Sequence, residues 1–176
     1  STLLRLIGGI DTPDRGESVR DCRVSWPVGL SGGFQGSLTG RQNAKFVCRV
    51  HGHDEDIEER LRFIAAFSEL GEAMDEPVRT YSTGMRARLA FAMSVAFEFD
   101  VYLVDEITSV GDVAFKQKAR MAFRELAQRA GLIMVSHDPK TLNQFCDQAV
   151  WLHDGRLEWF DNVPDALKAY SESMMR

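Results

Sequence analysis

The strongest constraint on the fold is a short apolar run, residues 101–104, that ends in two adjacent carboxylates, Asp105 and Glu106. A run that is apolar on both faces is typical of a buried strand in a parallel sheet. Residues 132–135 have the same character, so we expect both strands to be buried on both faces. A helical pattern lies between them, with apolar side chains on one face at Phe115, Ala119, Ala122, Phe123 and Leu126. A strand, a helix and a second strand within residues 101–135 predict a βαβ unit.

A helical segment interrupts this α/β pattern. From about residue 39 to 97 apolar side chains recur at helical spacing, and no convincing strand is present. Ile57, Leu61 and Ile64, for example, share one helical face behind an acidic start. We therefore expect a single domain over residues 1–176, in which an α-helical subdomain of about 39–97 is inserted into an α/β core.

The last third of the chain carries clear boundary signals. Asp138 followed by Pro139 predicts a helix N-cap with proline in the first turn. Asp154 and Gly155 lie between two apolar runs and predict a tight hairpin turn. A final helix is expected to begin near Pro164.

Composition excludes several classes of protein. Hydrophobic residues make up 44% and charged residues 27% of the 176 residues, as in ordinary globular chains. A formal net charge of −5 argues against a general nucleic-acid binder. No apolar run reaches the roughly 18 residues of a spanning helix, so a membrane role must come through a partner. The cysteines are too scattered for a metal site or a disulfide framework, which favours a reducing cytosol; they are Cys22, Cys48 and Cys146.

The first residues are also informative. Leu3, Leu6 and Ile7 have helical spacing, so a helix is expected from residue 1 with no strand or cap before it. We interpret the chain as truncated at its N-terminus.

The acid pair is the clearest candidate for chemistry. In parallel α/β sheets ligands bind beyond the carboxyl ends of the strands, where Asp105 and Glu106 lie. In nucleotide hydrolysis one acid can hold Mg²⁺ through water while its neighbour polarises the attacking water. The alternative is a solvated acidic loop or a helix cap.

Two further positions have both a functional and a structural interpretation. His137 follows the second strand, where it can hydrogen-bond a phosphate or remain a structural histidine. Ser82, Thr83 and Gly84 precede a helical pattern that we expect from Ala87. Free amides at a helix start suit an anion, but a plain N-cap explains the same residues.

In this order the motifs resemble those of the ABC-type ATPases, over essentially the whole chain. The resemblance implies an α/β P-loop NTPase (RecA-like) core with a parallel sheet and an inserted helical subdomain. Glu106 then matches the catalytic glutamate and His137 the switch histidine. The implied nucleotide-binding residues are Ser1, Thr2, Gln35, Ser82, Thr83, Gly84, Asp105 and Asp112. The implied magnesium ligands are Ser1, Gln35 and Asp105.

Two segments of the sequence resemble the family's signature loop, and only one of them has the right context. Residues 30–33 spell the first four letters of the usual signature, but they precede Gln35 and open no helix. We therefore treat them as a flexible lead into the Q-loop, the family loop whose glutamine Gln35 resembles. Ser82 instead lies 23 residues before Asp105, where the family signature lies. The resulting YSTGM loop resembles the polysaccharide-export branch, which comprises capsule, O-antigen and teichoic acid exporters. Within that branch, O-antigen exporter subunits often continue into a carbohydrate-binding domain, and because this chain stops at Arg176 the resemblance favours capsular polysaccharide.

The resemblance implies cofactors, partners and a location. ATP and Mg²⁺ are the implied cofactors, and the partners are a second ATPase subunit and an integral-membrane permease, without nucleic acid. The chain would act peripherally at the cytoplasmic face of the bacterial inner membrane, docking through residues 39–50. Because no glycine-rich loop and lysine precede Ser1, we expect residues 1–176 alone to hydrolyse ATP negligibly. Two alternatives stay open: a non-transport ABC ATPase, and a non-hydrolysing cassette that acts as a permease-binding module.

Overall fold

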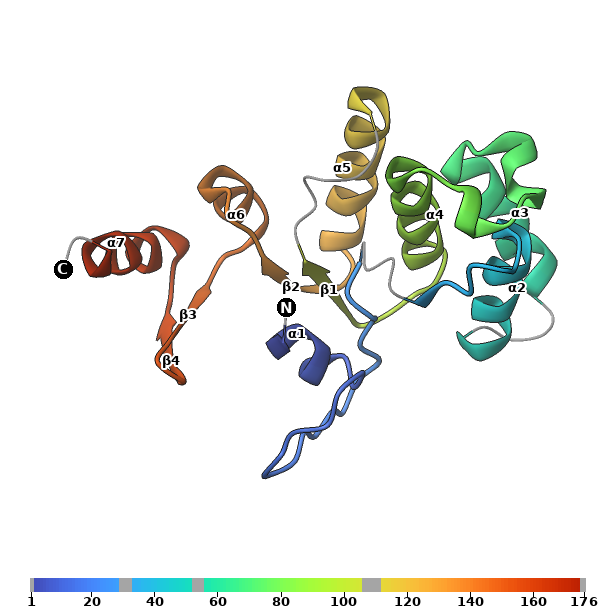
Figure 1. The fold of residues 1–176 in the computed structure, drawn as a ribbon. Coiled ribbons are helices and arrows are strands. Elements are labelled where there is room, and N and C mark those ends of the chain that lie inside the picture. The colour runs from blue at the N-terminus through green and yellow to red at the C-terminus, as the bar shows by residue number, and fades with distance from the viewer. Residues whose placement is uncertain (1, 29–32, 52–55, 106–111, 175–176) are drawn as a thin grey trace. The chain divides into compact units, whose positions relative to one another are not determined.

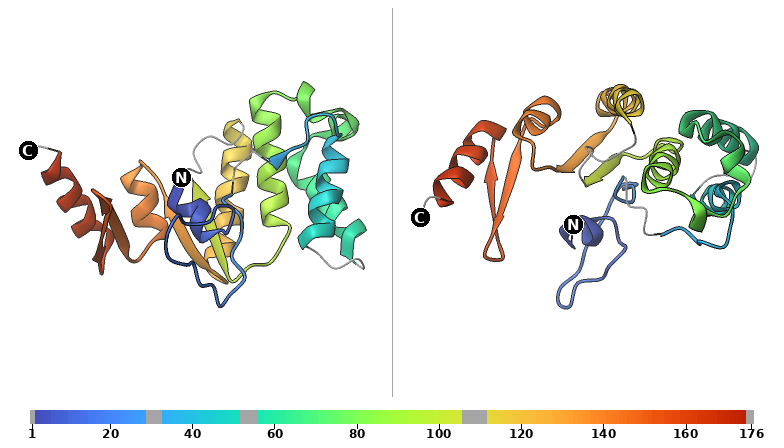
Figure 2. Two further views of the ribbon diagram at one scale, coloured as in Figure 1. Left: turned by 60° about the horizontal axis from the view of Figure 1, so that its bottom comes forward. Right: turned by 45° about the horizontal axis from the view of Figure 1, so that its top comes forward.

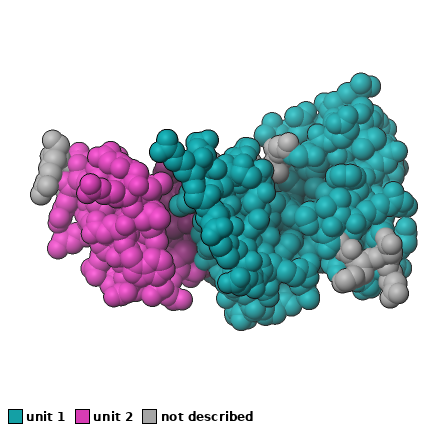
Figure 3. Space-filling view, turned by 90° about the horizontal axis from the view of Figure 1, so that it is seen from below, with its two compact units in different colours: residues 1–133 teal, residues 134–176 magenta. Residues whose placement is uncertain are grey.

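The computed structural model describes residues 2–28, 33–51, 56–105 and 112–174. They form two compact units, residues 1–133 and residues 134–176, which are coloured separately in Figure 3. The expectation of one domain over residues 1–176 stays a prediction, and each unit is described by itself.

The sheet of the first unit centres on β1 (Val101–Asp105), whose hydrogen-bonded neighbour is β2 (Gly131–Val135). A second segment supports β1, because Val24 and Val28 form parallel bridges with Val101 and Val104. Between the two strands lies α5 (Val113–Ala127), as Figure 1 shows. Its buried residues are Phe115, Ala119, Phe123 and Leu126. The α/β fold class is therefore confirmed.

The two strands differ in burial. The three central residues of β1 are fully buried, as expected. In β2 exposed and half-buried residues alternate, and Ile133 and Val135 are each 38% exposed. The expectation of burial on both faces is thus wrong for β2, because among the described strands it has β1 as its one partner.

A short helix packs on the same strand. Helix α1 (Thr2–Ile7) contacts β1 and buries Leu4. Just after it, the backbone of Gly8 approaches Leu103 so closely that an added Cβ would lie 3.1 Å from Leu103 Cδ1. The absence of a side chain at Gly8 therefore lets α1 approach the sheet.

The described residues between Gln35 and β1 form helices joined by short turns. The helices are α2 (Gly40–His51), α3 (Ile57–Ser68), η3 (Gly71–Asp75), η4 (Val78–Thr80) and α4 (Thr83–Val95). Helix α3 packs against both α2 and α4. One apolar cluster, which includes Ile64, Met74 and Leu89, fills the space between these helices.

The second unit contains α6 (Pro139–Phe145), β3 (Ala149–His153), β4 (Arg156–Phe160) and α7 (Val163–Ser173). Both views of Figure 2 show β3 and β4 as an antiparallel hairpin. Its turn has positive φ at Asp154 (46°) and Gly155 (73°), the geometry that an Asp-Gly turn favours. The predicted turn is confirmed, as are the N-cap at Asp138 and a helix with Pro164 in its first turn.

One face of this hairpin is an apolar stripe, made by Val150, Leu152, Leu157 and Trp159. Val150 lies opposite Trp159, and Leu152 lies opposite Leu157. The four side chains are between 46% and 62% exposed.

Across the whole described part of the chain, no helix has the length and apolarity needed to cross a bilayer.

Candidate nucleotide site

Asp105 is the last residue of β1, so the buried strand delivers its carboxylate to the C-terminal edge of the sheet. The side chain is half-buried. This edge is where ligands bind in open α/β sheets. Glu106, expected to be the catalytic neighbour, lies outside the described residues.

The signature residues form the start of α4. Ser82 has an extended backbone (φ −63°, ψ 163°), and its hydroxyl accepts a hydrogen bond from the Met85 N–H at 3.2 Å. The expected start at Ala87 is wrong, because this cap allows the helix to begin at Thr83. Thr83 and Gly84 therefore lie in the first turn, where backbone amides point out of the helix end. This geometry satisfies both interpretations: Ser82 is an N-cap, and the first turn presents amides suited to an anion.

Tyr81 anchors the residue before the cap. Its ring is buried, and its hydroxyl donates a hydrogen bond to the Ala73 carbonyl in η3. Burial raises the pKa of this hydroxyl above its ordinary value, so the group stays a donor at neutral pH. The residue before α4 is thereby fixed to η3 within the helical insert.

Gln35 lies on the segment before α2, and its backbone is held by Asn43. The Gln35 N–H donates to Asn43 Oδ1 at 2.9 Å, and the Asn43 amide donates to the carbonyls of Gln35 (3.2 Å) and Thr39 (2.9 Å). The Gln35 side chain itself is exposed and donates to Ser37 Oγ at 3.3 Å. Asn43 is a positioning residue that sequence reasoning missed; a polar residue on the buried face of a helix is the signal that could have found it.

Asp112 lies at the N-terminus of α5. One carboxylate oxygen accepts the Phe115 N–H at 3.0 Å, and the other pairs with the guanidinium of Arg88 on α4. The Phe115 N–H and Arg88 hold the pKa of Asp112 below its usual value. Asp112, expected to bind nucleotide, is thus engaged within its own chain, while residues 106–111 before it lie outside the described residues.

His137 belongs to the second unit, two residues after β2, and its side chain is exposed. The residues around it form a tight turn into α6: the Asp138 N–H donates to Ser136 Oγ at 3.1 Å, and Asp138 caps the helix through Lys140 and Thr141. His137 therefore projects from a well-anchored strand-to-helix turn.

The remaining expected positions lie at the N-terminal end. Thr2 is the first residue of α1, while Ser1 lies outside the described residues. In the described ranges no three His, Cys, Asp or Glu side chains gather as a metal cluster. The expected magnesium ligands are mostly neutral oxygens together with Asp105, a donor set of the kind that Mg²⁺ accepts alongside water.

Comparison with known proteins places this arrangement in a class. The family model described as ABC transporter matches residues 1–109. The polysialic acid transport ATP-binding protein KpsT of Escherichia coli is 50% identical over 99% of this chain and 80% of its own length. The capsule polysaccharide export ATP-binding protein CtrD of Neisseria meningitidis serogroup B is 44% identical over 97% of this chain and 78% of its own length.

Solved structures share the fold at lower identity. A structure described as the ATP-binding subunit of an ABC transporter has a TM-score of 0.79 at 20% identity, covering 97% of this chain and 76% of its own. The family match, these relatives and the fold thus define an ATPase with a P-loop NTPase fold. The chain belongs to the ABC transporter family, as one of its ATP-binding subunits.

Proposed function

We propose that this ABC ATPase powers export of a polysaccharide, most specifically a capsular polysaccharide, across the bacterial inner membrane. The observation that carries the proposal is the 50% identity, over nearly the whole chain, to an ATP-binding protein named for polysialic acid transport. A second relative named for capsule polysaccharide export, at 44% identity, supports the same polymer class.

The residues present fit ATP and Mg²⁺. Asp105 offers a carboxylate at the end of a buried strand, and oxygen ligands of this kind suit Mg²⁺. Bound Mg²⁺ would neutralise charge on the phosphate oxygens. Gln35 would hold a water or the ion with its exposed amide, and Glu106 would orient and deprotonate the attacking water. His137 would donate a hydrogen bond to a phosphate oxygen from its fixed turn.

The capped start of α4 would complete a site on a second subunit. Ser82, Thr83 and Gly84 present a hydroxyl and backbone amides at the positive end of a helix, which favours an anion. In a head-to-tail dimer of two ATPase subunits, this turn would close over the γ-phosphate bound by the partner. Asp112 would stand at the same interface.

Residues 39–50 are the proposed contact with the membrane permease. On α2, Phe46 and Val50 expose large apolar side chains, while Ala44 and Cys48 bury the opposite face. An amphipathic helix that keeps apolar groups in water offers area for a partner helix. The same helix carries Asn43, which holds the backbone of Gln35, so movement of α2 would reach the nucleotide site directly.

The catalytic roles are tested with Glu106→Gln in a protein where these 176 residues follow an intact phosphate-binding loop. We expect ATP binding within about twofold of wild type, loss of most hydrolysis, and a dimer trapped by ATP. Binding is measured by calorimetry, turnover by phosphate release, and the dimer by size-exclusion chromatography. Normal turnover would show that Glu106 does not have this role.

The transported polymer is tested in the producing cell. Asp105→Asn in the natural gene is expected to remove capsular polysaccharide from the surface and leave it inside the cell. Both pools are quantified with a capsule-specific antibody, and O-antigen is measured alongside. A normal capsule in a strain whose O-antigen is lost would replace the capsule assignment with O-antigen export, and normal levels of both would overturn polysaccharide export.

A further inference from the structure

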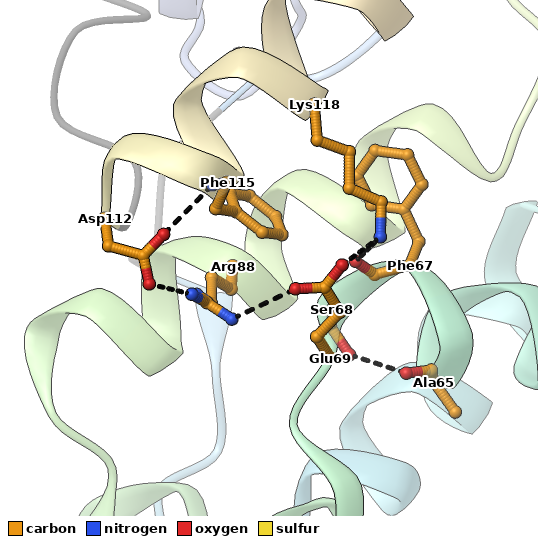
Figure 4. A network of polar contacts seen from close by, with 8 residues as sticks. All are labelled: Ala65, Phe67, Ser68, Glu69, Arg88, Asp112, Phe115 and Lys118. Atoms are coloured by element: carbon orange, nitrogen blue, oxygen red, sulfur yellow. Dashed lines mark hydrogen bonds and ion pairs between the residues drawn. The ribbon is translucent and has the colours of Figure 1, made fainter.

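Arg88 lies at the centre of a charged network that joins three helices, shown in Figure 4. Its guanidinium pairs with Asp112 at the start of α5 and with Glu69 Oε2 (3.6 Å) at the end of α3. Glu69 Oε1 also accepts from Lys118 Nζ at 2.7 Å, so the network returns to α5. We call the set of Glu69, Arg88, Asp112 and Lys118 the α4 clamp.

Arg88 is held on its flat face as well as at its edges. The guanidinium stacks over the ring of Phe115, with Cζ 4.8 Å from the ring centroid. Its side chain is 17% exposed, while the carboxylate side chains of Glu69 and Asp112 are 49% and 62% exposed, so the arginine is mostly buried and its acidic partners face the solvent. An arginine in contact with two carboxylates and a ring has one orientation available, which a lysine could not reproduce.

Glu69 occupies its place in the clamp despite an unfavourable backbone. It is the C-cap of α3, with φ 55° and ψ 33°, a left-handed conformation that usually belongs to glycine or asparagine. From there its two carboxylate oxygens reach Arg88 and Lys118. Lys118 in turn donates to the Phe67 carbonyl at 3.0 Å and stacks over the Phe67 ring, which ties it to the same turn of α3.

The clamp connects the parts that would meet a partner subunit. Helix α4 begins with Ser82–Gly84, and Arg88 lies on the next turn of that helix. Asp112 ends the segment that follows the acid pair and caps α5 in the α/β core. The clamp therefore spans the boundary between the helical insert and the core within the first unit.

We propose that Arg88 is a positioning residue for ATP hydrolysis, which sets the orientation of the signature turn relative to the start of α5. This inference rests on the proposed dimer, in which both elements contact the partner's nucleotide. With the clamp intact, the insert and the core approach the second subunit as one body, so that Ser82–Gly84 arrive in register with Asp112. Without it, each subunit still binds its own nucleotide, but the two contributions to the partner's site lose their alignment.

The test compares Arg88, near the start of α4, with Arg60 of α3, which contacts the other end of α4, in a protein where these residues follow an intact phosphate-binding loop. Arg60 stacks on Phe97 with Cζ 5.0 Å from the ring centroid, donates to the Ala96 carbonyl and is 23% exposed. It resembles Arg88 in burial and stacking, yet it joins α3 to the far end of α4. Arg60→Met is therefore the matched control for Arg88→Met.

We expect Arg88→Met to lower kcat about tenfold or more, with KM for ATP within about twofold, since misalignment by about 1 Å can cost a hundredfold in rate. The fraction of dimer formed with ATP should fall in parallel. Arg60→Met should lower the melting temperature to a similar extent but leave kcat within about twofold. Arg88→Lys should recover part of kcat, because one of the two pairs can form again.

A second variant and a structural measurement cover the case in which Arg88→Met folds poorly. Asp112→Asn keeps the acceptor for the Phe115 N–H and weakens the pair with Arg88, so it should lower kcat while α5 stays capped. Hydrogen exchange on the 176-residue chain should show faster exchange in the first turns of both α4 and α5 for Arg88→Met, and at neither place for Arg60→Met.

Three results would overturn the proposal: wild-type kcat in both Arg88→Met and Asp112→Asn, an equal loss of kcat in Arg60→Met, or a change confined to KM. These outcomes are separate from those for polysaccharide export, because purified ATPase can depend on Arg88 whatever polymer the cell exports. Conversely, loss of the capsule in the Asp105→Asn strain with no effect of Arg88→Met on turnover would retain export and reject the clamp.

Discussion

β1 and β2 are similar in sequence and differ in environment. Both are short apolar runs in the same βαβ unit, yet β1 buries Leu103 completely while Ile133 of β2 is 38% exposed. β1 is covered by α1 and bridged by Val24 and Val28, whereas β2 has a single described neighbour. Apolar composition predicts that each run forms a strand. The segments packed beside each strand decide how deeply it is buried, and so how much it contributes to stability.

The comparison is tested most strongly by truncating one residue in each strand. Leu103→Ala should lower the free energy of unfolding by about 2–5 kcal/mol, because it leaves a cavity in a filled core. Ile133→Ala should cost only about 1 kcal/mol, since part of its side chain already lies in water. Urea unfolding followed by circular dichroism measures both, and equal losses would show that the two strands are equally buried.

Crowding at Gly8 tests the contact of α1 with β1. An added Cβ would lie 3.1 Å from Leu103 Cδ1 and 3.2 Å from the Leu4 carbonyl oxygen, so Gly8→Ala should destabilise by about 1–3 kcal/mol. At Gly36 the nearest atom, Arg79 Cβ, would be 3.6 Å away, an ordinary contact. Gly36→Ala is therefore the control, and a larger loss there than at Gly8 would contradict the tight approach of α1.

Ser25 tests the polar side of the β1 environment. It is fully buried, and its hydroxyl accepts from the Leu103 N–H at 2.9 Å and donates to the Trp26 carbonyl at 2.8 Å. Ser25→Ala should cost about 1–3 kcal/mol, because the Leu103 N–H would lose its partner away from water. Ser136→Ala, next to β2, removes a half-buried acceptor that water can replace and should cost less. Thermal unfolding compares the two.

The smallest expected effect is a pH dependence beside β1. His51 packs on Trp26, with ring centroids 4.6 Å apart, and partial desolvation of its ring, together with the charge of Arg23, lowers its pKa. Because the folded-state pKa lies below the unfolded value of about 6.5, the contribution of His51 to stability is present above that pH and is lost as pH falls through the folded pKa. Melting temperatures measured from about pH 7.5 to about pH 5 should therefore decline less in His51→Phe than in wild type. Parallel curves would show that His51 does not contribute.

Much of the fold follows from local patterns in the sequence. The apolar run before Asp105, the cap at Asp138 and the Asp154-Gly155 turn each depend on residues close in the chain, and the structure has them as expected. The start of α4 was misplaced because Ser82 can be a loop residue or a cap, and the helix decides which.

The less predictable part of the site depends on contacts between distant residues. Arg88 pairs with Asp112, which lies 24 residues further along the chain, and the spacing of the two residues does not predict this ion pair. The exposure of β2 likewise depends on which segments lie beside it, which the run itself does not encode. Asn43 could have been found, since its amide lies on the buried face of α2.

The apolar stripe on the β3–β4 hairpin has a consequence for how this chain behaves in a test tube. Four facing side chains, with Trp159 the most exposed at 62%, form a contiguous exposed apolar surface on the hairpin. We expect hydrophobic dyes to bind there, and molecules in concentrated solution to associate through it. Trp159→Lys should make the hairpin more soluble without altering its turn.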